Sequence, residues 1–254
     1  MISFHDAKRL YREDPSTPGY WFYGDLRIQA DVDTHRFVNK YVRERFKIGS
    51  CILDVGTGEG ALAQQLLDAG MYVSVTSWNE KCSLQIPIYH VDFDQSFSAD
   101  DVGGHLYDMV CCIEIIEHLE NPSRFLRDCR RLVKPGGTVI LSTPNVESAQ
   151  ARFQWLLRGY PLIFGEGEIE KNRHISMLWG KGIEHFISIT GFRIVEKCLL
   201  GKFNLKPGFT SMLKRLLYSV MYLLLKGDIN GNTRLYVLKP TKTLLKSQGP
   251  NNVY

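Results

Sequence analysis

The stretch that most constrains the fold of this chain is residues 51–60, CILDVGTGEG. A short apolar run ends at Val55, a glycine-dense turn follows, and residues 61–67 have the composition of a helix start. Glycines adopt backbone angles that a side chain would block, and they let the main chain approach a ligand closely. The first turn of the helix adds unpaired N–H groups that favour a carboxylate or phosphate. Strand, turn and helix together predict the first unit of an α/β domain for a nucleotide-type ligand.

The turn by itself fits more than one class of ligand. Read as G-x-G-x-x-A from Gly56, it matches the dinucleotide fingerprint. Read as D-x-G-x-G-x-G from Asp54, it matches a nucleoside-binding turn preceded by an acid. A tight connection without any ligand is the third interpretation, because a single glycine motif has a real false-positive rate. The segments downstream decide between them.

Those segments alternate between strands and helices, as an α/β sheet requires. Residues 107–113 form a nearly continuous apolar run, which is typical of a strand buried on both faces. Asn121 and Pro122 mark the start of a helix over 124–132, and residues 134–137, KPGG, mark a turn. Further strands are expected over 71–76, 88–91, 138–142, 192–197 and 233–238, the last antiparallel, with another helix over 177–190.

With these segments in order, the chain resembles the class I S-adenosylmethionine-dependent methyltransferases. It is most similar to the small-molecule branch related to ubiquinone-biosynthesis and polysaccharide-cluster methyltransferases. The resemblance covers roughly residues 45–200 and rests on LDVGTGEG (53–60), YDMV (107–110) with E-x-x-E-H (114–118), LVKPGG (132–137), STPN (142–145) and GF (191–192). It implies an α/β fold: a doubly wound, mostly parallel seven-stranded sheet with helices on both faces and the last strand antiparallel.

The resemblance also implies a cofactor, S-adenosylmethionine (SAM), and its product S-adenosylhomocysteine (SAH). Gly56, Gly58 and Gly60 should wrap the methionine part of the cofactor, with Thr57 in the same turn. Asp54 should orient the turn and the amino group of the cofactor.

Three further regions should contact the cofactor. Asp92 and Phe93 should meet the adenine, and Glu114 should lie beside the cofactor at the end of the fourth strand. Ser77 stands where the family has an acid for the ribose, so either Trp78, Asn79 or Glu80 compensates or the affinity for the cofactor is lower.

For the acceptor, the resemblance implies a small molecule or a sugar- or lipid-linked intermediate that is methylated on oxygen. The polar, glycine-containing segment 164–175 should lie over the carboxyl ends of the strands as a loop, and such loops carry specificity. His174 in this segment is the candidate general base, because imidazole titrates near neutral pH; His118 is assigned a structural role. Two alternatives stay open: an NAD(P)-dependent oxidoreductase, and a non-catalytic methyltransferase-like binding or scaffold subunit.

The chain is expected to divide into an N-terminal helical and aromatic cap (1–45), a methyltransferase domain (46–240) and a flexible tail (241–254). The cap prediction rests on the aromatic residues 20–23 and on an amphipathic run from Ile28 to Phe46. Within the domain, residues 146–190 are expected as a lid and 206–226 as a helical insertion.

Composition bounds the partners and the compartment. Six scattered cysteines without C-x-x-C, the absence of H-E-x-x-H and a polar N-terminus predict a cytoplasmic protein with reduced thiols and no metal site. The net charge of +4 is uneven, because residues 202–246 hold nine Lys and Arg against one acid, Asp228. An apolar run at 216–225 is too short to span a membrane. These features predict peripheral contact with the inner membrane surface or a homodimer through 207–226, and no nucleic-acid partner.

Overall fold

The central feature of the fold is a seven-stranded sheet. The structure, a computed structural model, describes residues 10–77, 82, 84–201 and 224–241. The strand order is β6-β5-β4-β7-β8-β10-β9. The strands are β4 (Cys51–Val55), β5 (Tyr72–Thr76), β6 (Ile88–Tyr89), β7 (Tyr107–Cys112), β8 (Val133–Pro144), β9 (Phe192–Leu200) and β10 (Thr233–Pro240). β4 to β8 run parallel, and β10 is antiparallel to both of its neighbours, β8 and β9. The predicted fold class is confirmed.

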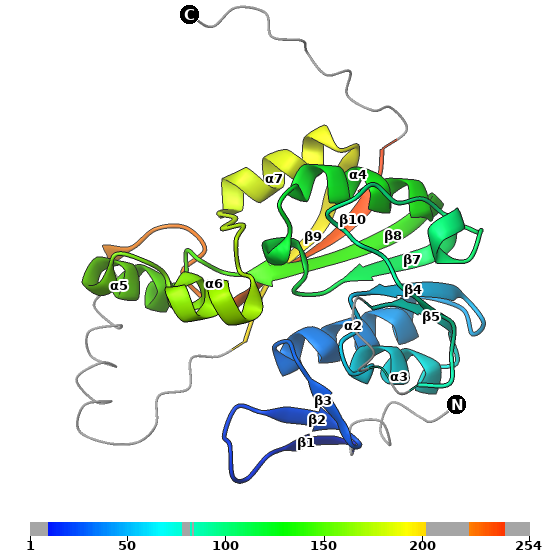
Figure 1. The fold of residues 1–254 in the computed structure, drawn as a ribbon, viewed down its shortest axis with the longest axis horizontal. Coiled ribbons are helices and arrows are strands. Elements are labelled where there is room, and N and C mark those ends of the chain that lie inside the picture. Colours follow the sequence, from blue (N-terminus) through cyan, green and yellow to red (C-terminus); the bar gives the residue numbers. More distant parts are fainter. Residues whose placement is uncertain (1–9, 78–81, 83, 202–223, 242–254) are drawn as a thin grey trace, which may run out of the picture.

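Helices cover both faces of this sheet (Figure 1). α4 (Pro122–Leu132) and α7 (Gly180–Ile189) cover one face, and α2 (Val32–Arg45) and α3 (Ala61–Asp68) cover the other. Alternate residues of β7 point to opposite faces, so Val110 packs in the cluster with α4 while Met109 packs in the cluster with α2 and α3. A strand buried on both faces is apolar throughout, which explains the continuous run in the sequence.

The N-terminal cap differs from its prediction. The aromatic stretch forms a small antiparallel sheet of β1 (Tyr11–Glu13), β2 (Trp21–Tyr23) and β3 (Leu26–Ile28). The helix α2 starts only at Val32, after Asp31, whose side chain accepts a hydrogen bond from the N–H of Asp33. Tyr23 donates to Asp68 at the end of α3 over 2.7 Å, which fastens the small sheet to the domain.

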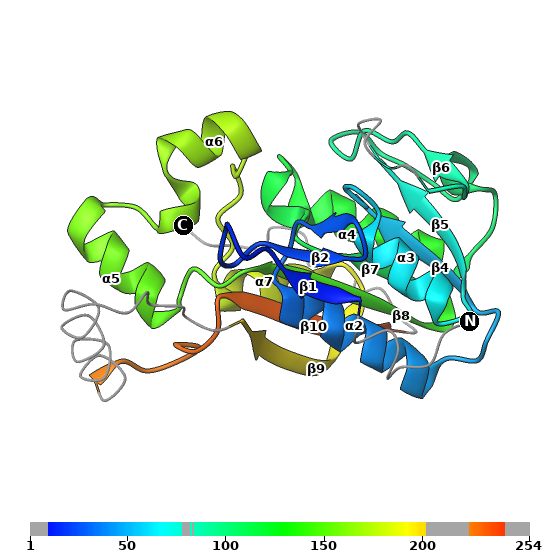
Figure 2. The same cartoon turned by 90° about the horizontal axis from the view of Figure 1, so that it is seen from below.

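A helical excursion, residues 148–179, separates β8 from α7. It contains α5 (Ala149–Arg158), a short 3-10 turn η3 (Leu162–Phe164) and α6 (Glu166–Asn172), followed by an extended stretch. α5 and α6 lie beyond the carboxyl end of β8, off the edge of the main body (Figures 1 and 2). The segment predicted as a polar loop therefore forms α6 in its central part, and α7 begins three residues later than predicted.

Two further details correct the sequence analysis. Residues 134–137, predicted as a turn, fall within the bounds of β8 as an irregular stretch, because the ladder with β7 passes from the pair of Tyr107 and Val133 directly to the pair of Met109 and Thr138. The loops also hold short 3-10 turns, η1 (Asp100–Val102) and η2 (Ile116–His118). Among the described residues, no helix combines the length and apolar character needed to cross a membrane. Most of the predicted insertion 206–226 and of the tail 241–254 lies outside the described residues.

Candidate cofactor and acceptor site

The glycine turn after β4 has a backbone that only glycine adopts without strain. Gly56, Gly58 and Gly60 have φ of +71°, +57° and +95°. A Cβ on Gly56 would lie 2.5 Å from Ile115 Cδ1, and one on Gly58 would lie 2.3 Å from Gln29 Oε1. Gly60 precedes α3 and provides no side-chain cap, so the first N–H groups of that helix keep their capacity to bind a ligand.

Asp54 lies directly behind this turn. Its buried carboxylate accepts a hydrogen bond from Thr57 Oγ1 over 2.7 Å. Thr76 on β5 holds the turn from the other side, since its Oγ1 accepts from the Gly56 N–H and its carbonyl from the Thr57 N–H. Burial raises the pKa of Asp54 to about 6, against the lowering effect of the Thr57 bond. A cation placed at the turn would favour the ionised form of this carboxyl.

The residues predicted to contact the ribose and the adenine lie in different surroundings. Ser77 is buried at the end of β5, where its N–H donates to the Tyr89 carbonyl. Trp78 lies outside the described residues. Asp92 is exposed and accepts from the Asp94 N–H, as in an Asx turn. Phe93 is only 7% exposed, because its ring packs edge-on against two core phenylalanines. Most of the Phe93 ring is thus occupied by core contacts, and its contact with adenine stays a prediction.

Glu114 follows β7 with a φ of +48°, which is rare for a residue with a side chain. Ser142 on β8 holds it twice, by accepting from the Glu114 N–H over 3.0 Å and donating to its carboxylate over 2.8 Å. Burial and the nearby charge of Asp31 raise the pKa of Glu114 to about 7. Strained backbone of this kind clusters at ligand-binding sites.

Three further side chains converge next to Glu114. Glu117, His118 and His174 each offer one ligand atom, and these atoms lie within 4.8 Å of one another. The carboxyl of Glu117 is buried, accepts from Thr143 Oγ1, and has a strongly raised pKa because of burial and the neighbouring Glu114. Glu117 also accepts, through its carbonyl, from the N–H groups of the two residues that follow His174 in the chain.

The hydrogen bonds of the two histidines fix their tautomers. His118 Nδ1 lies 2.6 Å from the Asn172 carbonyl and His174 Nδ1 lies 2.7 Å from the Ile163 carbonyl. A carbonyl only accepts, so each Nδ1 carries the proton and each Nε2 keeps its lone pair. The two rings stand edge to face, 4.7 Å apart, and burial lowers the pKa of His118. Both Nε2 atoms can therefore bind a proton or a divalent cation.

The structure brings His174, the predicted general base, next to His118, and the role of His174 as a base stays a prediction. The predicted base does lie at the carboxyl ends of the strands, and His118, assigned a structural role, stands beside it. A metal site is not among the sequence predictions. The only sequence signal was E-x-x-E-H at 114–118, because His174 is 56 residues further on and joins the group through the turn after α6.

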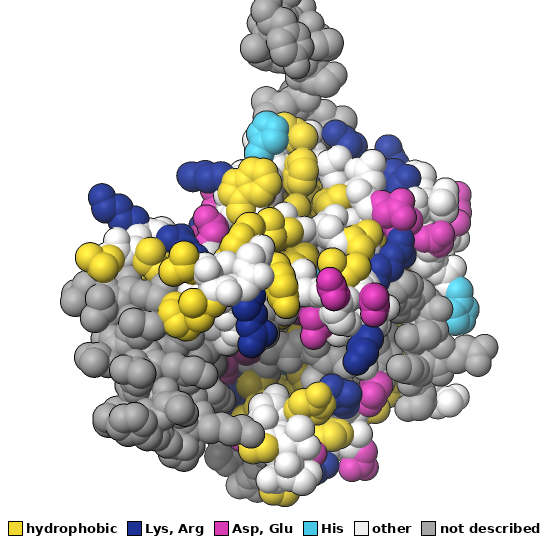
Figure 3. Space-filling view, turned by 60° about the vertical axis from the view of Figure 1, so that its left-hand side comes forward, with side chains coloured by type: hydrophobic (Ala, Val, Ile, Leu, Met, Phe, Trp, Pro, Cys, Tyr) yellow, Lys and Arg dark blue, Asp and Glu magenta, His cyan; other side chains and the backbone are white. Residues whose placement is uncertain are grey.

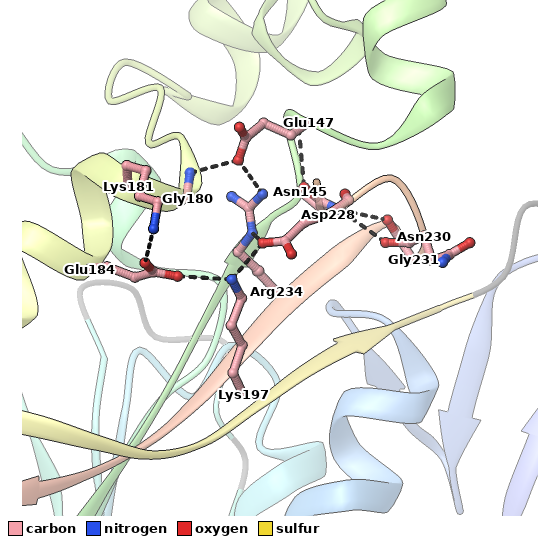
Figure 4. Close-up of polar contacts among 10 residues, drawn as sticks. All are labelled: Asn145, Glu147, Gly180, Lys181, Glu184, Lys197, Asp228, Asn230, Gly231 and Arg234. Carbon is pink, nitrogen blue, oxygen red and sulfur yellow. Dashed lines mark hydrogen bonds and ion pairs between the residues drawn. The ribbon is translucent and has the colours of Figure 1, made fainter. Parts of the chain in front are cut away.

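A second polar cluster at the base of the excursion was also missed (Figure 4). Arg234 on β10 is completely buried and pairs with Glu147, whose carboxylate also accepts from the Gly180 N–H over 2.8 Å. Asp228 pairs with both Arg234 and Lys197. Glu147 precedes the excursion and Gly180 follows it, so this cluster joins the two ends of residues 148–179.

The strand order, with an antiparallel strand between the fifth and sixth, and an acid followed by a glycine turn define a methyltransferase-type α/β protein. A family model described as "Methyltransferase domain" matches residues 27–197. The chain therefore belongs to the class I S-adenosylmethionine-dependent methyltransferase family, as predicted.

Individual relatives match over shorter lengths. The ubiquinone biosynthesis O-methyltransferase of Thiobacillus denitrificans is 37% identical over 106 residues, which cover 38% of this chain and 45% of that protein. The protein of the same name from Pseudomonas paraeruginosa is 36% identical over 136 residues, covering 49% and 58%. The chain thus spans about half the length of the curated relatives it matches. Neither alternative function receives support from these comparisons.

The fold comparison agrees. Magnesium protoporphyrin IX methyltransferase from Synechocystis PCC 6803, solved with bound SAH, superposes with a TM-score of 0.55 at 16% identity. The superposition covers 82% of this chain and 83% of that one.

Proposed function

We propose that this protein binds SAM at the glycine turn and transfers its methyl group to a hydroxyl of a small molecule. The observation that carries the proposal is the convergence of His118, His174 and Glu117 beside the strand ends next to the turn. Groups that remove a proton are needed for a hydroxyl acceptor. The names of the relatives, ubiquinone biosynthesis O-methyltransferases, support the same atom and acceptor class.

The reaction is an in-line displacement. The acceptor oxygen attacks the methyl carbon, the carbon–sulfur bond breaks, and its electron pair stays on sulfur, which leaves neutral SAH. The protein positions donor and acceptor, which can supply about 7–11 kcal/mol of the barrier. Asp54 and Glu114 place carboxyl groups near the cofactor, and they complement the positive charge of SAM before transfer.

His174 removes or helps to remove the proton of the hydroxyl. In the simplest arrangement its Nε2 takes the proton directly, an effect typically worth about 10²–10⁴ in rate. In the second arrangement, Glu117, His118 and His174 would hold a divalent cation, which would lower the pKa of a hydroxyl bound to it. The second is favoured here, because both imidazoles donate their Nδ1–H to main-chain carbonyls, which is the usual orientation of metal-ligating histidines. Two imidazoles and a carboxylate suit a first-row ion such as Zn²⁺.

The proposed acceptor is amphiphilic, a lipid- or sugar-linked intermediate. α5 exposes Trp155, Leu156 and Leu157 next to Arg158, with Leu156 80% exposed. The face that carries this end of the molecule shows hydrophobic side chains at the surface among Lys and Arg (Figure 3). Such a surface, together with the basic and apolar residues of 207–226, supports peripheral contact with the inner membrane surface or a homodimer. A cytoplasmic location is part of the same proposal.

The test is methyl transfer from SAM to a panel of catechols and phenols with short and long alkyl tails, followed by mass spectrometry. His174→Ala should lower kcat by at least about 10²-fold without changing the affinity for SAM. His185→Ala, at an exposed histidine of α7, is the matched control and should retain activity. Methylation on nitrogen or carbon only, or full activity of His174→Ala, would contradict the proposal.

A further inference from the structure

The stretch between β3 and α2 lies directly on the glycine turn. Gln29 Oε1 is 2.3 Å from the place where a Cβ on Gly58 would be, so its side chain touches the bare backbone of the turn. Two residues earlier, the Arg27 N–H donates to Glu59 Oε2 over 3.1 Å. The N-terminal cap is thus fastened to the turn at two adjacent points, from a part of the chain that the glycine motif does not include.

The same stretch extends towards the opposite wall of the site. Asp31, two residues after Gln29, lies near enough to Glu114, which follows β7, for its charge to raise the pKa of that carboxyl. Residues 27–31 therefore run from the turn after β4 towards Glu114, which follows the neighbouring strand β7. In open α/β sheets the ligand lies outside the carboxyl ends of such strands. Gln29 is in this strip, and it is exposed, so its amide can exchange water for a ligand.

Residues 27–31 and Glu114 include no cationic side chain directed at the glycine turn that could donate to a carboxylate. Asp31 and Glu114 are acids and suit the cationic groups of SAM. Three arginines of the cap, Arg12, Arg27 and Arg36, have their guanidinium groups over aromatic rings. A glutamine amide offers two N–H donors, and hydrogen bonds to a charged acceptor are stronger than neutral ones.

We propose that Gln29 recognises the amino-acid end of the cofactor, with its side-chain amide donating to the carboxylate of the methionine part. This rests on the proposed function, since it assumes that SAM lies on the glycine turn. Gln29 then selects ligands that carry the carboxylate over nucleosides that lack it. The N-terminal cap becomes a part of the cofactor site rather than a structural addition.

The experiment compares two ligands by calorimetric titration. SAH carries the amino acid, whereas 5′-methylthioadenosine keeps the adenosine and thioether but lacks the amino and carboxyl groups. Gln29→Ala should bind SAH about tenfold more weakly and 5′-methylthioadenosine as the parent does. Gln29→Glu should bind SAH still more weakly, because two carboxylates then face each other. Asp25→Ala, at an exposed position in the β2–β3 turn of the same cap, is the control and should match the parent.

Three outcomes overturn the inference. Unchanged SAH affinity in Gln29→Ala shows that the amide makes no contact with the carboxylate. Equal weakening of both ligands shows that Gln29 only shields the site. In both cases the parent still binds SAH and the proposed function stands. A parent that binds no SAH removes the proposed function, and this inference falls with it.

Discussion

Asp54→Asn removes a buried charge from behind the glycine turn, and its effect on stability can be worked from the structure. Burial raises the pKa of Asp54 from 3.8 to about 6. One pKa unit is worth about 1.4 kcal/mol, so the ionised carboxyl lowers the free energy of unfolding by about 3 kcal/mol at pH 8.

The sign follows from proton binding. The folded chain holds this proton more tightly than the unfolded chain, so the stabilising effect of protonation is complete below pH 4. It is lost as the pH rises through about 6. Asparagine does not titrate, and its amide oxygen can still accept from Thr57 Oγ1.

The assay is urea unfolding of the ligand-free parent and variant at pH 5 and pH 8. The stability of Asp54→Asn relative to the parent should increase by about 1–2 kcal/mol between these two values. Glu114 and Glu117 are present in both proteins, so their contributions to the pH dependence of stability cancel in the difference between variant and parent. Asp25→Asn, at an exposed carboxyl, is the control. Asp54→Asn should also bind SAM more weakly than the parent, so that this substitution gains stability and loses function. A stability difference that stays constant with pH would refute the reasoning.

Three further predictions follow from the site and the excursion. Arg234→Met should lower the free energy of unfolding by about 3–5 kcal/mol, because it leaves the partly buried Glu147 without its cation. Glu147→Gln should lower it by less. Equal stability of Arg234→Met and the parent in urea would contradict this prediction. Treatment with EDTA should abolish methyl transfer and added Zn²⁺ or Mn²⁺ should restore it, whereas full activity after chelation would leave His174 as a direct base. The parent should co-sediment with anionic liposomes at low salt and be released at high salt. The double variant Leu156→Asp, Leu157→Asp should bind these liposomes more weakly. A parent that stays in the supernatant in every condition would favour the homodimer through 207–226.

The sheet was predictable because its signals are local. An apolar run such as 107–113 and a glycine turn after Val55 each determine a strand or its end within a few residues. The secondary structure of the cap was harder to predict, because the aromatic residues at 20–23 are compatible with a helix or with a strand. Their pairing is decided by the contact of Tyr23 with Asp68, 45 residues away. Helix α6 also escaped prediction, since its seven residues are mostly polar and none of them is buried.

The candidate site shows the same division. The residues of the glycine turn could be assigned from spacing, whereas Phe93 could not, because its packing against Phe125 depends on a helix 30 residues further on. Arg234 and Glu147 lie 87 residues apart, and a lone arginine in a strand pattern reads as an exposed residue. Gln29 carried no signal at all. Its position on Gly58 follows from the way the cap folds back onto the domain.

The measurement that tests the central claim most directly is calorimetric titration of the parent with SAM, SAH and NAD(P)H. We expect SAM and SAH to bind at one site per chain and NAD(P)H to give no binding heat. Gly58→Val should abolish the SAM signal, because a side chain at a φ of +57° strains the turn and collides with the Gln29 side chain that lies on it. Absence of SAM and SAH binding in the folded parent, binding of NAD(P)H, or parental affinity in a folded Gly58→Val variant would contradict the account.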